Sequence, residues 1–222
     1  LSDKNPKAGL YWDEDTPLHD AAKNGELEIV IYLSQILPDK NPSNKDGGTP
    51  LHCAAFGGHL DIVKFLASNL TDKNPSDANG ATPLHYAAVE GKLDIVKYLT
   101  SLLSDKNPKA GLYLDENTPL HLAAENGHFG AVKIIADCLE DKHPKSYTKV
   151  TPANLAKEAG HFHIANFLWH GSDGLDLEND LTVRKRSTRK PRSRYQSPLK
   201  MISGIFRTKS LTPQKARKTK KA

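Results

Sequence analysis

The stretch Thr82-Pro-Leu-His-Tyr-Ala-Ala-Val-Glu-Gly91, followed by Leu93-Asp-Ile-Val-Lys-Tyr-Leu99, decides the fold of this chain. Threonine is a good helix N-cap, and the proline after it suits the first helical position, where a missing N–H costs nothing. The glycine marks a turn, and the apolar residues that follow it recur at helical spacing. The stretch therefore predicts two short antiparallel helices joined by a glycine turn.

The same stretch recurs along the sequence at a nearly fixed period. Thr-Pro-Leu-His occurs four times, and a degraded copy, Thr-Pro-Ala-Asn, begins a fifth unit. The units start at Thr16, Thr49, Thr82, Thr118 and Thr151, with gaps of 33, 33, 36 and 33 residues. Such a period indicates a stacked array in which each unit buries its apolar face against its neighbours.

These units resemble the ankyrin repeat, and the resemblance covers roughly residues 1–169. It implies an all-α solenoid with one helix pair and one hairpin loop per unit, in which residues 1–15 form the end of a preceding repeat. It also implies protein partners, held along a concave face of first helices and hairpin tips. The glycine that commonly ends the second helix is replaced by leucine, so that turn needs another geometry or lets the helix run on. The leucines concerned are Leu37, Leu70, Leu103 and Leu139.

A longer copy is visible as well, because Ser2-Asp-Lys-Asn-Pro-Lys-Ala-Gly-Leu-Tyr11 recurs from Ser104 to Tyr113. The 36-residue gap places three extra residues in the loop between units. We expect them to lengthen two hairpin tips, one carrying Tyr11 and Trp12 and the other Tyr113. These aromatic residues are candidate partner contacts.

The two ends of the array differ in sequence. The chain opens in the middle of an inter-unit loop, so we expect a fragment of a longer array whose first unit lacks a neighbour; Ile31, where the next unit has Lys64, agrees with this. In the last unit, Ala153, Asn154 and Lys157 replace the Leu, His and Ala of the inner units. Terminal repeats need such a polar outer face.

The first helices carry a candidate binding stripe. Phe56, Tyr86, Val89 and Leu122 occupy variable positions after the motif histidines, and the family resemblance places these helices along the partner-binding face. Aromatic anchors often dominate the energy of an interface. The alternative is that some of these side chains pack between adjacent helices.

Composition changes abruptly after Trp169. Residues 170–222 hold 15 Lys and Arg against 4 Asp and Glu, a net charge of +11, which leaves −6 for residues 1–169 within the formal total of +5. This segment is rich in Ser, Thr and Pro and poor in apolar residues, so it cannot bury enough surface to offset its ordering entropy. We expect residues 170–222 to be a separate tail, disordered from about residue 172.

Two basic clusters in this tail are typical of nuclear import signals or of nucleic-acid contacts. The tail has four possible surroundings: an import receptor, nucleic acid, anionic lipid, or solvent alone. Ser197 and Thr212 each precede a proline and have a lysine three positions on, the pattern of proline-directed phosphorylation. The clusters contain Arg184, Lys185, Arg186, Arg189, Lys190, Arg192, Lys215, Arg217, Lys218, Lys220 and Lys221.

The sequence lacks the motifs of several function classes. The motif histidines stand one per unit, so they cannot converge on one metal ion, and we expect no metal and no cofactor. Phosphate loops and nucleophile elbows are missing, which favours a non-enzyme. With no transmembrane stretch in the sequence and only two cysteines, the cytosol or the nucleus is expected. The sequence thus predicts a protein-binding adaptor or scaffold; the alternative is a binder of nucleic acid or anionic membrane through the tail.

Overall fold

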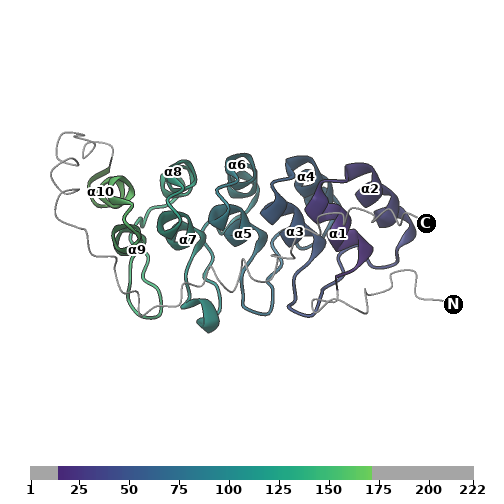
Figure 1. The fold of residues 1–222 in the computed structure, drawn as a ribbon, viewed down its shortest axis with the longest axis horizontal. Coiled ribbons are helices and arrows are strands. Elements are labelled where there is room, and N and C mark those ends of the chain that lie inside the picture. Colours follow the sequence, from purple (N-terminus) through teal and green to yellow (C-terminus); the bar gives the residue numbers. More distant parts are fainter. Residues whose placement is uncertain (1–14, 172–222) are drawn as a thin grey trace, which may run out of the picture.

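A computed structural model describes residues 15–171 of the chain. Within these residues ten α-helices form five antiparallel pairs, one short 3₁₀ helix lies in a loop, and there is no β-strand. Figure 1 shows the first helices of the pairs in one row, the second helices in a parallel row, and hairpin loops projecting beyond the first row. The predicted all-α solenoid is confirmed, whereas the predicted disorder of the tail lies outside the described residues.

The helix bounds follow the repeat period. The first helices are α1 (Pro17–Asn24), α3 (Pro50–Gly57), α5 (Pro83–Val89), α7 (Pro119–Glu125) and α9 (Pro152–Ala159). The second helices are α2 (Leu27–Ile36), α4 (Leu60–Asn69), α6 (Leu93–Leu102), α8 (Phe129–Asp137) and α10 (Phe162–His170). The 3₁₀ helix η1 (Leu112–Leu114) lies in the longer loop between α6 and α7.

Every first helix starts as its motif predicts. The five motif threonines are N-caps in extended conformation, and each is followed by proline at the first helical position. In the first four repeats the motif histidine side chain also reaches back to the N-cap backbone and completes a capping box. Because a helix of seven or eight residues is marginal alone, these caps set where it begins.

The turn within a pair depends on glycine. Gly25 has φ 83° and ends α1 in the left-handed region, which a residue with a side chain rarely adopts. A Cβ there would also lie 2.6 Å from the ring of His59 in the next repeat. The glycine therefore provides both the turn and the close approach of the neighbouring repeat.

The second helices end without glycine. Leu37, Leu70 and Leu103 follow α2, α4 and α6 in extended conformation, with ψ between 138° and 145°. Of the two outcomes left open by the sequence, the different turn geometry is the one observed in these three repeats. Leu37 is buried, so its side chain adds to the core while its backbone leads into the next hairpin.

The core lies between the two rows of helices and between successive pairs. Leu51, Leu84 and Leu120 come from equivalent positions of α3, α5 and α7, and all three are fully buried. Pairs of alanines later in the same helices, such as Ala87 and Ala88, are also fully buried. Their small side chains let neighbouring first helices approach closely, so the stack forms one continuous core.

Candidate functional site

A ladder of four histidines joins successive repeats. In the first, the backbone N–H of Thr16 donates to His19 Nδ1 over 3.1 Å, and His19 Nε2 lies 3.0 Å from the carbonyl oxygen of Gly48 in the next hairpin. Since Nδ1 accepts a hydrogen bond, Nε2 carries the proton and donates to that carbonyl. Three further rungs are His52 to Ala81, His85 to Asn117 and His121 to Val150, at 3.1, 3.2 and 3.1 Å.

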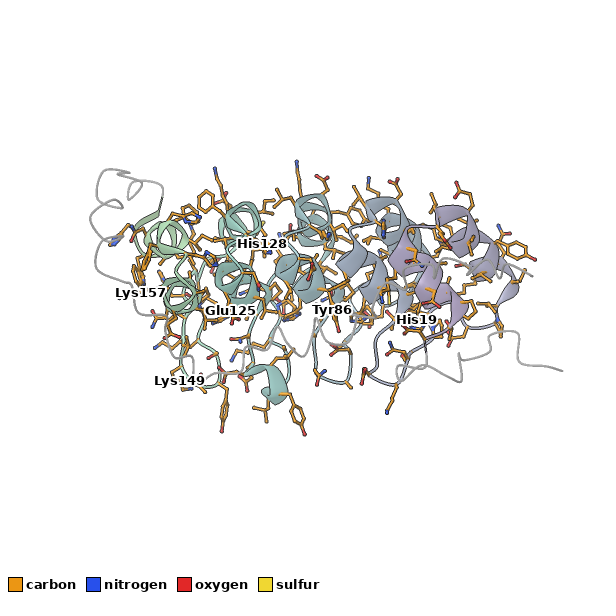
Figure 2. All side chains as sticks on the ribbon, in the orientation of Figure 1. His19, Tyr86, Glu125, His128, Lys149 and Lys157 are labelled. Atoms are coloured by element: carbon orange, nitrogen blue, oxygen red, sulfur yellow. The ribbon has the colours of Figure 1, made fainter. Side chains whose placement is uncertain are left out.

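Burial keeps these histidines neutral. It lowers the pKa of His52 to about 4, that of His85 to about 3 and that of His121 to about 4, against the smaller raising effect of their carbonyl partners. The pKa of His19 is lowered for the same reason. Figure 2 shows His19 in the row of first helices, above the hairpin loops. The four histidines are therefore structural side chains.

Tyr86 anchors the hairpin of its own repeat. The side chain is fully buried, and its hydroxyl donates to Asp77 Oδ2 over 2.8 Å. Asp77 Oδ1 in turn accepts the backbone N–H groups of Asn79 and Ala81, both at 2.8 Å. The ring also packs edge-on against His52, with centroids 5.2 Å apart. Tyr86 is thus a core residue (Figure 2).

The predicted binding stripe is wrong for three of its four members. Tyr86, Val89 and Leu122 are buried, with 2% exposure or less, on the helices α5 and α7, each of which packs against a first helix on both sides. Phe56 is partly buried, and its ring centroid lies 6.5 Å from that of Tyr86 in the next repeat. In the middle of a stack both sides of a first helix are covered, which is the packing alternative considered from the sequence.

The hairpin tips are linked to one another by single backbone hydrogen bonds. Ala78 N donates to Asp46 O over 2.9 Å, and Gly111 N donates to Asn79 O over 2.7 Å. The next step along the row is Tyr147 N to Asp115 O, at 2.8 Å. The tips therefore form a continuous edge along the lower side of Figure 1.

Two neighbouring tips on this edge expose apolar side chains. Tyr113 is 81% exposed and Leu112 is 66% exposed, both on η1, and Tyr147 on the next tip is 62% exposed. We call Leu112, Tyr113 and Tyr147 the tip surface. The corresponding tips of the second and third repeats carry Lys45-Asp-Gly-Gly48 and Ala78-Asn-Gly-Ala81 instead.

A buried carboxylate locks these two tips together. Asp115 Oδ1 accepts the backbone N–H of Thr148 over 3.0 Å, and Asp115 Oδ2 accepts the Thr148 hydroxyl over 2.6 Å. Asp115, Glu116 and Lys149 have φ values of 55°, 51° and 67°, and among residues 15–171 no other non-glycine residue has a positive φ. Such strained conformations persist only where surrounding contacts fix them. The tip surface is therefore held rigidly.

The charges beside the tip surface are exposed. Lys109 Nζ lies 2.8 Å from Glu116 Oε2, and both side chains are accessible to solvent, so this pair stabilises little. Lys149 lies on the same lower edge in Figure 2. The tip surface thus has an apolar centre with a polar rim, which is the anatomy of protein interfaces.

Comparison with known proteins agrees with this geometry. A family model of ankyrin repeats (3 copies) matches residues 18–110 and 100–179. The chain belongs to the ankyrin-repeat family. A search of curated proteins finds no match to this sequence.

As ankyrin repeats are generally protein–protein interaction modules, the family supports the coarse expectation of protein partners. The structure places the predicted contact Tyr113 at an exposed tip. Leu112 beside it and Tyr147 on the neighbouring tip are exposed as well, and neither was predicted from the sequence. Tyr147 stands four residues before Thr151, where the second and third repeats have Lys45 and Ala78. The aromatic residue at a position where other repeats have lysine or alanine is the feature of the sequence from which Tyr147 could have been predicted as a contact.

Between residues 15 and 171, no three His, Cys, Asp or Glu side chains are grouped so as to hold a metal ion. Over the same range no helix has the length and apolar character to cross a membrane. Cys53 is buried and Cys138 is exposed, and both are free thiols.

Several predicted residues lie outside the described part of the chain. Tyr11 and Trp12 precede residue 15, and the two basic clusters and both phosphorylation candidates, Ser197 and Thr212, follow residue 171. They remain predictions.

Proposed function

We propose that this ankyrin chain is a non-catalytic protein-binding module whose tip surface contacts the partner. The observation that carries the proposal is the exposure of Leu112, Tyr113 and Tyr147, at 66%, 81% and 62%, on two tips joined through Asp115. Large side chains so exposed bury much apolar area when a partner covers them, and burial of apolar area is the main favourable term in association. Tyrosine is also among the residue types enriched at binding hot spots.

The rigidity of the two tips supports the same proposal. The bond from Tyr147 N to Asp115 O and the two bonds from Thr148 to the Asp115 carboxylate fix the loop backbones before any partner arrives. A surface that is already ordered loses less entropy on binding. A partner with an apolar groove rimmed by polar groups would complement the tip surface.

We also propose that the tail acts as a targeting signal. Its net charge of +11 and its two basic clusters suit an import receptor in a protein that works in the cytosol or the nucleus. Phosphates at Ser197 and Thr212 would each add about −1.5 to −2 charges and weaken contacts with anions. In the rival function the tail itself binds nucleic acid or an anionic membrane, and the repeats only position it. That rival rests on charge alone, which gives sequence-independent, salt-sensitive attraction.

Affinity capture from cell lysate with the full chain tests the proposal. The double variant Tyr113→Ala, Tyr147→Ala removes the aromatic part of the tip surface, and Tyr32→Ala removes a tyrosine of α2 that is also well exposed. We expect a set of proteins, retained at high salt, that the double variant loses and Tyr32→Ala keeps. If the double variant captures the same proteins as the unmodified chain, the proposed function of the tip surface is wrong.

A tail variant of the same full chain distinguishes the proposed function from binding through the tail. Replacement of the basic residues of both clusters by serine and glutamine should leave the salt-resistant proteins bound. Loss of all capture in this variant, together with nucleic acid or lipid in the eluate of the unmodified chain that disappears at high salt, would support the rival instead.

A further inference from the structure

The turn at the hairpin tip is built in the same way in three repeats. In the second and third repeats, the backbone N–H groups of Gly47 and Gly80 donate to the carbonyl oxygen three residues earlier, over 3.1 and 2.9 Å. In the last repeat the N–H of Lys149 makes the equivalent bond over 3.1 Å. Lys149 therefore stands, two residues before the motif threonine, where the other two turns have glycine.

The backbone of Lys149 has the conformation that this turn requires. The φ angle is 75° at Gly47, 73° at Gly80 and 67° at Lys149, all in the left-handed region. Glycine adopts this region freely, whereas a residue with a Cβ is destabilised there. The last repeat thus keeps a lysine where glycine would fold better, and strained residues of this kind cluster at functional sites.

The surroundings of Lys149 explain how a side chain fits there but not why it is a lysine. At Gly47 and Gly80 an added Cβ would lie 2.6 and 2.5 Å from a backbone nitrogen of the following tip. Lys149 is on the last tip of the described array, and its side chain is exposed at the lower edge of Figure 2. It forms no ion pair with another side chain of residues 15–171. Its ammonium group is therefore available to a partner.

A second lysine stands beside the tip surface in the same way. Lys145 and Lys149 are two residues before and two residues after Tyr147, and both are exposed. Like Lys149, Lys145 forms no ion pair within the described part of the chain. The exposed tyrosine of the last tip thus has a free cation on either side of it in the sequence.

The carboxylates of the same two tips are already engaged. Residues 109–117 and 145–150 contain two of them, Asp115 and Glu116. The Asp115 carboxylate is buried and accepts two hydrogen bonds from the neighbouring tip, and Glu116 Oε2 lies 2.8 Å from a lysine ammonium. A partner that covers the tip surface therefore meets two free ammonium groups and no free carboxylate on these residues.

This charge distribution disfavours other occupants of the tip surface. The tail carries a net charge of +11, and symmetric pairing of two copies would bring the same lysines together, so both meet like charge. Nucleic acid binding rests on neutralising many phosphates along the backbone. Residues 15–171 hold 14 Lys and no Arg against 19 Asp and Glu, a net charge of −5, which repels a long polyanion.

We propose that the tip surface binds an acidic protein segment in which carboxylates flank an apolar side chain. The inference rests on the proposed function of the tip surface and adds the chemistry of the partner. The apolar side chain would pack against Leu112, Tyr113 and Tyr147, and the carboxylates would accept hydrogen bonds from Lys145 and Lys149. Charges at the rim of an interface determine specificity and association rate more than affinity.

Selection of short random peptides displayed on phage tests this proposal. The full chain is the bait, and peptides that also bind the double variant Tyr113→Ala, Tyr147→Ala are discarded. Because both proteins carry the same tail, this step removes peptides held by the basic clusters. We expect the remaining peptides to be rich in Asp and Glu around a leucine or an aromatic residue.

Substitution of Lys149 measures its role with one selected peptide in fluorescence anisotropy. Lys149→Glu should weaken binding about tenfold or more, because attraction becomes repulsion, and Lys149→Gly about threefold. Since glycine suits the left-handed turn, Lys149→Gly should unfold at no lower urea concentration than the unmodified chain, so its weaker binding is not a loss of folding. Lys45→Glu changes an exposed lysine of another tip and should leave the affinity within about twofold.

Several results would overturn the inference and leave the proposed function intact. They are tip-dependent peptides with no excess of acidic residues, or unchanged affinity in Lys149→Glu. Displacement of the peptide by an equimolar single-stranded DNA oligonucleotide, measured on the variant without the basic residues of the tail, would indicate nucleic acid instead. A dimer of the unmodified chain that the double variant loses would indicate a second copy. If no peptide distinguishes the full chain from the double variant, the proposed function itself fails.

Discussion

At the C-terminal end of the array Lys157 and Asn154 face solvent, whereas at the N-terminal end Ile29 and Tyr32 do. Both ends use the same helix pair with the same threonine cap and glycine turn. The two end repeats differ in the residues of the outward face and in the motif histidine, which is His19 in the first repeat and is replaced by Asn154 in the last. Local signals therefore specify the repeat, whereas the exposed residues of its outward face can vary without changing the helix pair.

The largest expected difference between the ends is at Ile164 and Ile29, which share one helix position. Ile164→Lys places a charge at a fully buried site, and we expect the unfolding free energy to fall by about 3–5 kcal/mol. Ile29→Lys should change it by no more than about 0.5 kcal/mol, because the site is 46% exposed. Urea unfolding followed by far-UV circular dichroism compares the two, and equal losses would remove the basis of the comparison.

The histidine ladder, which stops one repeat before the C-terminal end, should make stability depend on pH. The folded-state pKa values of His52, His85 and His121, about 4, 3 and 4, lie below the ordinary value of 6.5, so the unfolded chain binds more protons. Their contribution is complete above about pH 6.5 and is lost as pH falls toward 4, at up to about 1.4 kcal/mol per pH unit for each histidine. Urea unfolding at several pH values between about 4 and 6.5 gives the unfolding free energy at each pH. This free energy should fall less steeply with falling pH in His85→Asn than in the unmodified chain.

Loss of one ladder rung at neutral pH should have a smaller effect. His85→Asn leaves the Asn117 carbonyl without its donor inside the stack, and we expect a cost of about 2 kcal/mol. Asn154 stands at the same motif position in the last repeat, where its side chain is exposed and bonds only within the repeat. Asn154→Ala should change the unfolding free energy by no more than about 0.5 kcal/mol. If Asn154→Ala lowered the unfolding free energy more than His85→Asn, the side chain at this motif position would matter more in the last repeat than between repeats, contrary to the account.

The smallest expected effect on stability is that of Lys157→Leu, which makes the C-terminal end resemble the N-terminal one. We expect the unfolding free energy to change by no more than about 0.5 kcal/mol, since the side chain is exposed. In the unmodified chain the Lys157 ammonium lies 5.5 Å from the centroid of the exposed Trp169 ring. Without it, sedimentation velocity at rising protein concentration should show more self-association, because the exposed apolar patch is larger. Unchanged sedimentation would mean that Lys157 is not needed to close the stack.

The sequence was sufficient to predict the repeats because their signals are local. Thr16, Thr49, Thr82, Thr118 and Thr151 all cap helices as expected, and the glycine turns lie at their predicted places. The sequence did not decide the geometry of the turn after α2, α4 and α6, because leucine alone does not distinguish a longer helix from an extended turn. Packing of a residue such as Leu37 into the core decides it.

The candidate site was only partly predictable, because exposure depends on neighbouring repeats. Tyr113 was correctly placed at a tip, since the three extra residues had to enlarge the loop. The predicted partner contacts of Tyr86 and Val89 were wrong, because a variable position on a first helix can be buried within the stack rather than face a partner, as Tyr86 is against His52 of the preceding repeat. The sequence predicts exposure at Ile31 of α2, yet Ile31 is partly buried, and Ile29 is the isoleucine exposed on that helix.

Native-state hydrogen exchange of residues 1–222 tests most directly whether the second helix of the first described repeat is packed less completely than that of the last. Helices with fewer buried contacts open at a lower free-energy cost, and the exchange rate of their amides reports that cost. The account predicts that the slowest amides of α2 exchange about tenfold or more faster than the slowest amides of α10. Equal protection of the two helices, or slower exchange in α2 than in α10, would contradict it.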